Sequence, residues 1–200
     1  MPSILWAGTA GHNVTAGRSG QAPTAISNHV MLGTLVGTRS AFADPAHQAS
    51  AHYGIGADGT ILQFVQDSDM AWANGPIRRP NLAAVPWLAE CSARHINPNW
   101  RTISIEWEGR HLGGTWTKVL FEGKWLDTLK RGTIRACWAP TPAQYAAGLW
   151  LHQQLIARHG IVRDRAHITR HSDYDSVTKW FCPGDGFPMA RLIADLGGHL

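Results

Sequence analysis

The 200-residue sequence has little charge, few cysteines and no long apolar run, and each shortage excludes a class of protein. Charged residues make up 16% of the chain against 44% hydrophobic residues, a balance that favours a globular domain over a disordered chain. No apolar run approaches the roughly 18 residues that a membrane-spanning helix needs, so we expect no membrane partner. The opening residues lack the charged start and apolar run of a secretory signal, so we expect no signal peptide.

The three cysteines, Cys91, Cys137 and Cys182, are too few for the disulfide framework of a small secreted domain. A single Cys91–Cys137 bridge fits this count, although we expect both thiols to be reduced. Cys182 stands immediately before Pro183-Gly184, and a thiolate ahead of such a turn is well placed to bind a metal. A buried free cysteine beside a turn is the simpler alternative for the same residue.

The formal charge of +4 is unevenly spread, with a net of −2 over residues 1–75 and +6 over the remainder. A basic half suits a polyanionic partner, either nucleic acid or an anionic cell wall. Adjacent basic residues occur only at Arg78-Arg79 and Lys130-Arg131, so the chain has no dense basic run. We therefore expect no nucleic-acid partner.

The order of the expected elements indicates an α/β fold, a single domain with a central mixed β-sheet flanked by α-helices. Residues 1–24 are expected to be a loosely structured lead-in, and residues 25–200 to form the domain. Runs of β-forming residues, turn residues and capping residues predict the individual elements. These are strands at 25–30, 102–107 and 167–171, a hairpin at 51–65 around Ala57-Asp58-Gly59, mostly loop at 74–100, and helices at 141–160 and 188–196.

Two of these segments carry further detail. Thr141 is expected to cap the first helix, with Pro142 at its first position, Gln144 completing a capping box and Gly160 ending it. After the strand at 25–30 we expect a Gly/Thr loop.

The strand at 102–107 alternates, which places Ile103, Ile105 and Trp107 on one face and Ser104 and Glu106 on the other. A carboxylate on a central strand is costly unless it is paired or used, so Glu106 is a candidate catalytic base. By pattern alone Glu108 is an equal rival, and a salt-bridged, partly exposed strand residue is the plain alternative. Lys179 is suited to bring positive charge to a metal site, or is an ordinary loop lysine.

His29 and His171 each end a predicted strand and enter a polar loop, where a side chain is held rigidly while one side stays open. A catalytic zinc takes three protein ligands and keeps a fourth position for water. With Cys182 as the third ligand, the sequence offers such a set, although from spacing alone a surface or satisfied core position is the default for each histidine. We expect the zinc site at one edge of the sheet face.

Five collinear segments covering about residues 25–196 resemble the type 2 N-acetylmuramoyl-L-alanine amidase family, which includes phage endolysins, the recycling amidase and the peptidoglycan recognition proteins. They are SNHVMLGT (27–34), SAHYGIGADGTILQFVQDSDMAWANG (50–75), NWRTISIEWEG (99–109), TPAQYAAGLWLHQQLIARHGI (141–161) and HSDYDSVTKWFCPGD (171–185). The resemblance implies zinc ligands at His29, His171 and Cys182. It also implies a catalytic glutamate at Glu106 rather than Glu108, and a catalytic lysine at Lys179.

The sequence departs from the family pattern in places. Cys182 follows Lys179 by three residues rather than two, which leaves Asp173 as a reserve ligand. Ala51 stands where some members have a catalytic tyrosine, and Tyr53 is expected to point to the opposite face. Ala73 replaces a common histidine contact.

The span 110–140 is longer than the family usually needs. It carries Trp116, Trp125 and Trp138, which suit a wall of the substrate groove, but its fold is not predicted.

The resemblance implies a Zn²⁺-dependent enzyme that cuts the amide between N-acetylmuramic acid and L-alanine of peptidoglycan. A phage or prophage endolysin is the expected role, monomeric, held in the host cytoplasm until lysis and then acting on the cell wall. The alternatives are a cytoplasmic muropeptide-recycling amidase, a peptidoglycan-binding module without catalysis, and a cysteine peptidase using Cys182. Because a nucleophilic cysteine usually opens a helix and Cys182 precedes a Pro-Gly turn, the peptidase is disfavoured.

Overall fold

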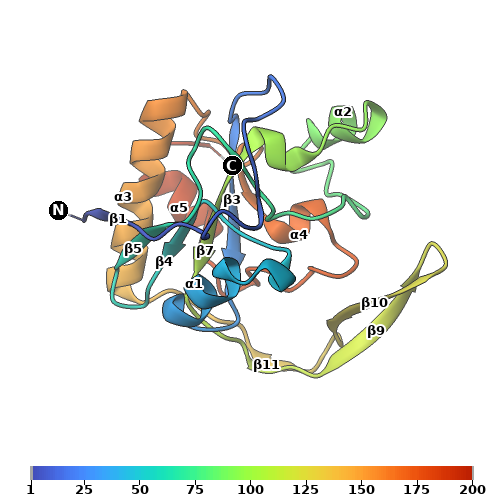
Figure 1. Cartoon of the computed structure of the whole chain (residues 1–200). Coiled ribbons are helices and arrows are strands. Elements are labelled where there is room, and N and C mark those ends of the chain that lie inside the picture. Colours follow the sequence, from blue (N-terminus) through green and yellow to red (C-terminus); the bar gives the residue numbers. More distant parts are fainter. Residues whose placement is uncertain (1, 200) are drawn as a thin grey trace.

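A mixed six-stranded sheet forms the centre of the computed structural model, which describes residues 2–199 (Figure 1). The strand order is β1-β5-β4-β7-β3-β12, and the β4–β5 pair is antiparallel while the other neighbours are parallel. The predicted α/β class with a mixed sheet is confirmed. The bounds are β1 Ile4–Trp6, β3 Ala25–Val30, β4 Tyr53–Ile55, β5 Ile61–Gln63, β7 Thr102–Trp107 and β12 Ile168–Arg170.

The predicted strand at 25–30, the strand at 102–107 and the hairpin at 51–65 are all confirmed. The lead-in expected at the N-terminus is wrong in part, because Ile4–Trp6 pairs with Ile61–Gln63 as the edge strand of the sheet. A second short strand of this region, β2 (Val14–Thr15), pairs with β6 (Met70–Ala71). Ile4 and Val14 lie against core clusters, so apolar contacts hold residues that composition alone suggested were loose.

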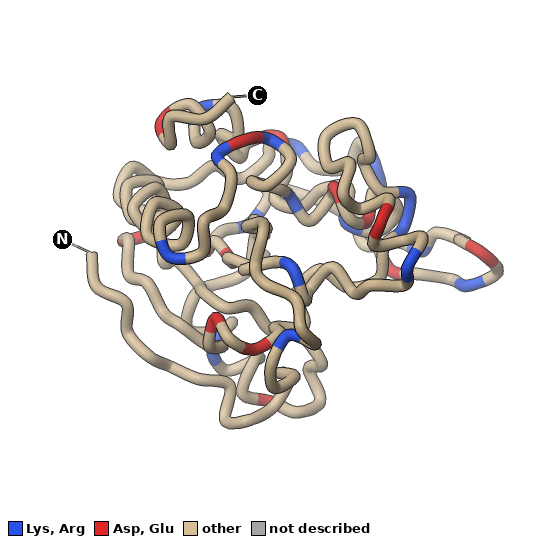
Figure 2. The backbone as a smooth tube through the Cα atoms, turned by 90° about the horizontal axis from the view of Figure 1, so that it is seen from above, with Lys and Arg blue, Asp and Glu red and all other residues tan. Residues whose placement is uncertain are grey.

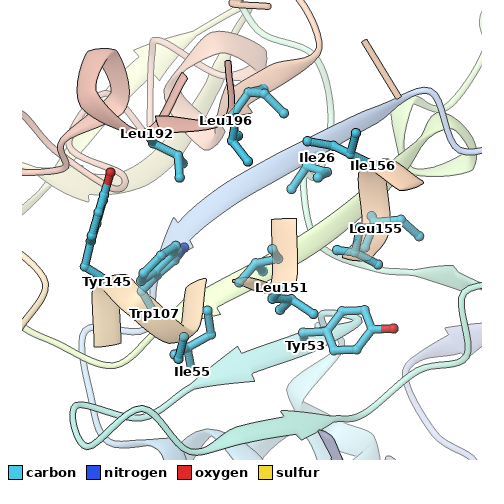
Figure 3. Packing of buried hydrophobic residues seen from close by; sticks show 14 of the residues in the cluster. Ile26, Tyr53, Ile55, Trp107, Tyr145, Leu151, Leu155, Ile156, Leu192 and Leu196 are labelled. Carbon is cyan, nitrogen blue, oxygen red and sulfur yellow. The ribbon is translucent and has the colours of Figure 1, made fainter. Parts of the chain in front are cut away.

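One face of the sheet is apolar and is covered by α3 (Pro142–His159) and α5 (Met189–Asp195) (Figure 3). Ile103, Ile105 and Trp107 all point to this face, as the alternation of the strand predicts. The helix approaches closely at Gly148, where an added Cβ atom would collide with the Trp107 ring. On the opposite face the same strands carry polar side chains, and that face holds the candidate site.

The capping of α3 is half as predicted. Thr141 accepts a hydrogen bond from the backbone N–H of Gln144, and Gly160 ends the helix in the left-handed conformation. Gln144 does not complete a capping box, because its side-chain amide donates to the carbonyls of Ile55 and Glu108 instead. It therefore ties the start of the helix to the ends of β4 and β7.

Two helices stand where loops were expected. The predicted Gly/Thr loop is confirmed for residues 31–34, but α1 (Leu35–Ala43) follows it directly, with the N-cap Thr34 accepting a hydrogen bond from the backbone N–H of Gly37. The proline-rich segment contains α2 (Leu88–Ala93) and a 3-10 helix at Pro98–Arg101, although most of it is loop. Another 3-10 helix spans Pro45–His47, the short α4 spans His171–Tyr174, and the last predicted helix is confirmed as α5.

The long insertion folds into a protruding β-arm (Figure 1). Its base pairs β8 (Leu112–Gly113) with β11 (Ile134–Ala136), and its outer part pairs β9 (Trp116–Phe121) with β10 (Lys124–Leu129). Glu122 and Gly123 both have positive φ, which gives the tight two-residue turn of a β-hairpin. We call residues 112–136 the arm.

Among the described residues, no helix is both long enough and apolar enough to cross a membrane.

Candidate metal centre and active-site cleft

The strand register brings the predicted ligands together. His29 of β3 pairs with Glu106 of β7, so both side chains stand on the polar face. On the other side of β3, Arg170 of β12 pairs with Asn28, which places His171 one step further along, level with His29. The site therefore lies at the carboxyl ends of three adjacent parallel strands.

His29, His171 and Cys182 form a compact, buried cluster. Their candidate ligand atoms all lie within 4.8 Å of one another, and the two Nδ1 atoms are 2.9 Å apart. Cys182 reaches the cluster from the loop after α4, where its sulfur accepts a hydrogen bond from the backbone N–H of Val30. Ligands of one tetrahedral zinc lie about 3–4 Å apart, so only small movements separate this cluster from a three-ligand site.

Each imidazole is oriented through its second nitrogen. His171 Nε2 donates to the backbone carbonyl of Asn74 at 3.2 Å, which leaves Nδ1 free to act as a ligand. His29 Nε2 lies 3.1 Å from the hydroxyl of Ser27, two residues earlier on the same strand face. Such partners fix the orientation and tautomer of metal-binding histidines.

Burial keeps both imidazoles neutral. Desolvation lowers the pKa of His29 to about 3, and it lowers the pKa of His171 well below its ordinary value, with the charge of His29 adding to the effect. Neutral imidazole is the form that binds a metal ion. Burial and the neighbouring Glu106 raise the pKa of the Cys182 thiol in the metal-free chain.

Glu106 stands beside the cluster with one Oε1 atom 3.9 Å from His29 Nδ1 and 17% of its side chain exposed. Burial raises the pKa of this carboxyl to about 7, while the charge of Lys179 acts in the opposite direction. Its Oε2 atom has no hydrogen-bond partner within the described part of the chain. A carboxyl with such a pKa is suited both to accept and to return a proton near neutral pH.

Lys179 is presented by a turn that Asp175 organises. The Asp175 carboxylate accepts hydrogen bonds from the backbone N–H groups of Val177 and Thr178 and from the Thr178 hydroxyl, and forms an ion pair with Arg78 at 2.7 Å. The backbone N–H of Lys179 donates to the Asp175 carbonyl. Lys179 and Asp175 both line the cleft described next.

The cluster opens into a cleft of about 560 Å³. Glu106, His171, Lys179 and Cys182 line the cleft together with residues of α1 and of the segment 72–76. Arg110 and Trp116, at the start of the insertion, complete its wall. A neighbouring hollow, which shares Gln48, Trp72, Gly75 and Pro76 with the cleft, extends this depression towards residues 95–99.

The model of the family described as N-acetylmuramoyl-L-alanine amidase matches residues 19–185, most of the chain. The chain belongs to this family.

Individual relatives agree with this assignment. N-acetylmuramoyl-L-alanine amidase A of Achromobacter lyticus is 28% identical over 181 residues, which cover 88% of this amidase and 86% of the relative. Among solved structures, the endolysin amidase LysCS of Clostridium intestinale is similar with a TM-score of 0.54 and 16% identity, covering 99% and 97% of the two chains. A selenomethionine derivative of AmpD is similar with a TM-score of 0.61 and 21% identity, covering 98% and 95%. These two likenesses show the fold. The family and its curated relative show the activity, an amidase acting on peptidoglycan.

The structure places several sequence candidates away from the cluster. Glu108 accepts from the backbone N–H of Leu35 at the start of α1. Asp173, the reserve ligand, instead binds Arg165 and the backbone N–H of Arg170, so it is not available as a third ligand. Tyr53 points into the apolar core, the face opposite the site, as expected, and its hydroxyl donates to Asp67 (Figure 3).

The remaining candidates fall as follows. Ala51 is buried in the second core cluster, and Ala73 lines the cleft of the amidase without a polar group. Cys91 and Cys137 are both free thiols, as expected. Of the three tryptophans in the insertion, Trp116 lines the cleft, Trp138 packs near Trp107 in the core, and Trp125 is exposed on the arm.

Sequence reasoning missed Ser27, Asn74 and Asp175. The signal for Ser27 was present, because alternation places it on the same face as His29. Asn74 acts through its backbone carbonyl, which carries no side-chain signature. Asp175 acts by holding a turn, and only the folded chain shows which backbone groups it meets.

Proposed function

We propose that this amidase hydrolyses the amide between N-acetylmuramic acid and L-alanine with a zinc ion held by His29, His171 and Cys182. One observation carries the proposal: two neutral imidazoles and one sulfur from three separate segments meet at a strand end, beside a carboxyl whose pKa is near 7. The donor set fits zinc, which binds histidine nitrogen and cysteine sulfur. When bound, zinc polarises the substrate carbonyl and lowers the pKa of a water molecule towards about 7.

Glu106 is proposed as the general base and acid. It accepts a proton from the attacking water as the lactyl carbonyl carbon of the muramic acid is attacked, and returns that proton to the departing alanine nitrogen. Among residues 2–199, the only other acidic side chain that lines the cleft is Asp175, which four hydrogen-bonding groups already occupy. The carboxyl of Glu106, with its unpaired Oε2, is the group left to move a proton.

Lys179 is proposed to stabilise the oxyanion. Lys179 lines the same cleft as Glu106, His171 and Cys182, and its positive charge acts to lower the pKa of Glu106, so the ammonium is suited to favour negative charge developing in the cleft. A preorganised group of this kind contributes about 3–4 kcal/mol to the transition state in well-studied enzymes.

We further propose that the amidase acts on polymeric wall as a monomeric endolysin rather than on recycled muropeptides. The cleft continues into a second open hollow, which suits a substrate longer than one muropeptide. The similarity to the endolysin LysCS supports the same role, although AmpD shares the fold. In this role the amidase is made in the host cytoplasm and reaches the cell wall at lysis.

The decisive experiment compares Glu106→Gln with the parent chain. The variant should keep one zinc per chain by elemental analysis and the same thermal midpoint, yet lose turbidity clearing of purified sacculi. Mass spectrometry of the parent's products should show free L-alanine amino ends and intact muramic acid. Undiminished lysis by Glu106→Gln would refute the assignment of the base.

Assays on the same purified protein and sacculi distinguish the proposed amidase from two other functions. A binding module without catalysis would retain sacculi but release no muramoyl ends. A cysteine peptidase would resist chelation, whereas the proposed amidase loses activity with EDTA and regains it with added zinc. The raised pKa of the Cys182 thiol opposes the peptidase, because a nucleophilic cysteine needs a lowered pKa.

A further inference from the structure

The arm presents an exposed row of apolar side chains that begins at the catalytic cleft. Trp116, Lys118 and Leu120 of β9 share one face with Trp125 and Asp127 of β10, because Trp125 pairs with Leu120 and Asp127 pairs with Lys118. Trp116 is 60% exposed, Leu120 is 55% exposed and Trp125 is 65% exposed. We call these five residues the outer face of the arm.

The outer face is continuous with the metal cluster. Trp116 lines the cleft, and its ring packs edge-on against Phe181, 6.1 Å between centroids. Phe181 precedes Cys182, and both belong to one buried cluster with Leu129 at the base of the arm. From Trp116 to Leu120 the strand runs about 13 Å outward, longer than one saccharide ring.

The arm is held in place at both ends, although an isolated two-stranded ribbon is only marginally stable. At its base the Thr128 hydroxyl donates to the Thr178 carbonyl, and the Trp180 indole donates to the Leu129 carbonyl. Near its tip the Arg79 guanidinium lies over the Phe121 ring at 5.4 Å. These contacts use the inner face and the base. On the outer face Trp116 packs against Phe181, while Leu120 and Trp125 remain exposed and available to a ligand.

We propose that the outer face binds the glycan strand of peptidoglycan and guides it into the cleft. Pyranose rings carry apolar C–H faces that pack on indole rings, and their hydroxyl groups suit the exposed Lys118–Asp127 pair, 3.7 Å apart, that lies between Trp116 and Trp125. The inference rests on the proposed function, since it takes the same polymer as substrate.

The charge of the arm agrees with this occupant. The arm holds five Lys and Arg against two Asp and Glu, a net of +3 (Figure 2). Peptidoglycan carries carboxylates on its stem peptides, and a basic arm attracts them. This attraction acts over a distance and weakens as the salt concentration rises.

Two other occupants fit less well. A membrane-inserting face would be apolar throughout, whereas an ion pair interrupts this one. A second copy of the chain, docked arm against arm, would bring a net charge of +3 against a net charge of +3, which opposes association.

The test compares Leu120→Ser/Trp125→Ala with Trp6→Ala. Trp6 is a matched control because it is 58% exposed on β1, near the N-terminus and far from the arm (Figure 1). Each chain is assayed for kcat/KM on purified sacculi and on a soluble muramoyl tripeptide without a glycan chain. Retention on sacculi is measured by pelleting in the Glu106→Gln background.

The arm variant should lose about fivefold or more in kcat/KM and in retention on sacculi, since an aromatic contact contributes on the order of 1 kcal/mol. It should cleave the soluble tripeptide at the parental rate, and Trp6→Ala should match the parent on both substrates. Equal losses on both substrates would show that the arm only shapes the cleft, and an unchanged rate on sacculi would end the proposal.

Two further outcomes would also overturn it. In one, the parent binds phosphatidylglycerol–phosphatidylethanolamine vesicles and the arm variant does not, while both are retained equally on sacculi. The other is a parental dimer that the arm variant converts to a monomer in sedimentation. A parent that cleaves neither substrate would instead refute the proposed function.

Discussion

Replacing His152 by leucine should make the amidase more resistant to acid. His152 lies fully buried in α3, near the Trp107 ring, on the face of the sheet opposite His29, His171 and Cys182. Its Nδ1 donates to the Gly148 carbonyl at 2.8 Å, while its Nε2 has no partner in residues 2–199. Burial lowers the pKa of His152 to about 4, although the hydrogen bond to Gly148 opposes the shift.

The magnitude follows from proton linkage. A histidine titrates near 6.5 in the unfolded chain, so on acidification the unfolded chain binds the proton before the folded chain does. The stabilisation from neutral His152 is therefore complete above about pH 6.5 and is lost as the pH falls towards about 4, at about 1.4 kcal/mol per pH unit. At pH 4.5, about two units below 6.5, this group should cost the fold about 3 kcal/mol.

Urea unfolding at pH 7.5 and pH 4.5 measures this contribution. His152→Leu should lose less free energy of unfolding between the two pH values than the parent, by about 3 kcal/mol. Leu155→Ala, a truncation in the same helix without a titratable group, should lower stability equally at both pH values. Parallel losses in the parent and in His152→Leu would show that the buried ring does not link folding to protonation.

The other expected outcomes concern the site and the packing. Asp175→Ala should lower the free energy of unfolding by about 3 kcal/mol, since it leaves Arg78 and the turn unpaired. The variant should keep most of its bound zinc but lose kcat on a muropeptide. A kcat equal to the parent's would show that Lys179 does not depend on that turn. Gly148→Ala should destabilise by about 1–3 kcal/mol in urea unfolding, because the added methyl meets the Trp107 ring, and unchanged stability would contradict this close approach. Zinc at a thousandfold excess over its dissociation constant should raise the free energy of unfolding of the parent by about 4 kcal/mol, measured in thermal melts. Cys182→Ser should lose most of that gain, and an undiminished gain would show that the sulfur is not a ligand.

The elements that the sequence predicted well are those with a strong local signal. Thr141, Pro142 and Gly160 mark both ends of α3, and the alternation of 102–107 gives β7 and both of its faces. β1 was missed because three residues carry no measurable periodicity, and its pairing with β5 is decided by the rest of the sheet. The arm was missed because its turn is Glu122-Gly123, and a glutamate with positive φ is not a usual hairpin signal.

For the site, sequence predicted which residues would meet but not how they are oriented. His29, Glu106 and His171 come from strand ends that register makes adjacent, so their convergence follows from the order of the strands. The partners that orient the imidazoles are a hydroxyl and a backbone carbonyl, and the latter belongs to a loop whose path only long-range packing determines.

The register of β3 and β7 decides both stability and chemistry. Ile26 and Ile103 pair on the face that α3 covers, and His29 pairs with Glu106 on the face that opens to the cleft. Because side chains alternate, a slip of one residue in β7 would bury Glu106 under α3 and turn Ile105 towards the cluster. The burial of the apolar face against α3 opposes that slip. It therefore also keeps His29 and Glu106 paired at the ends of their strands. The core of this amidase therefore stabilises the geometry of the proposed site directly, through a register that either face alone would specify less strongly.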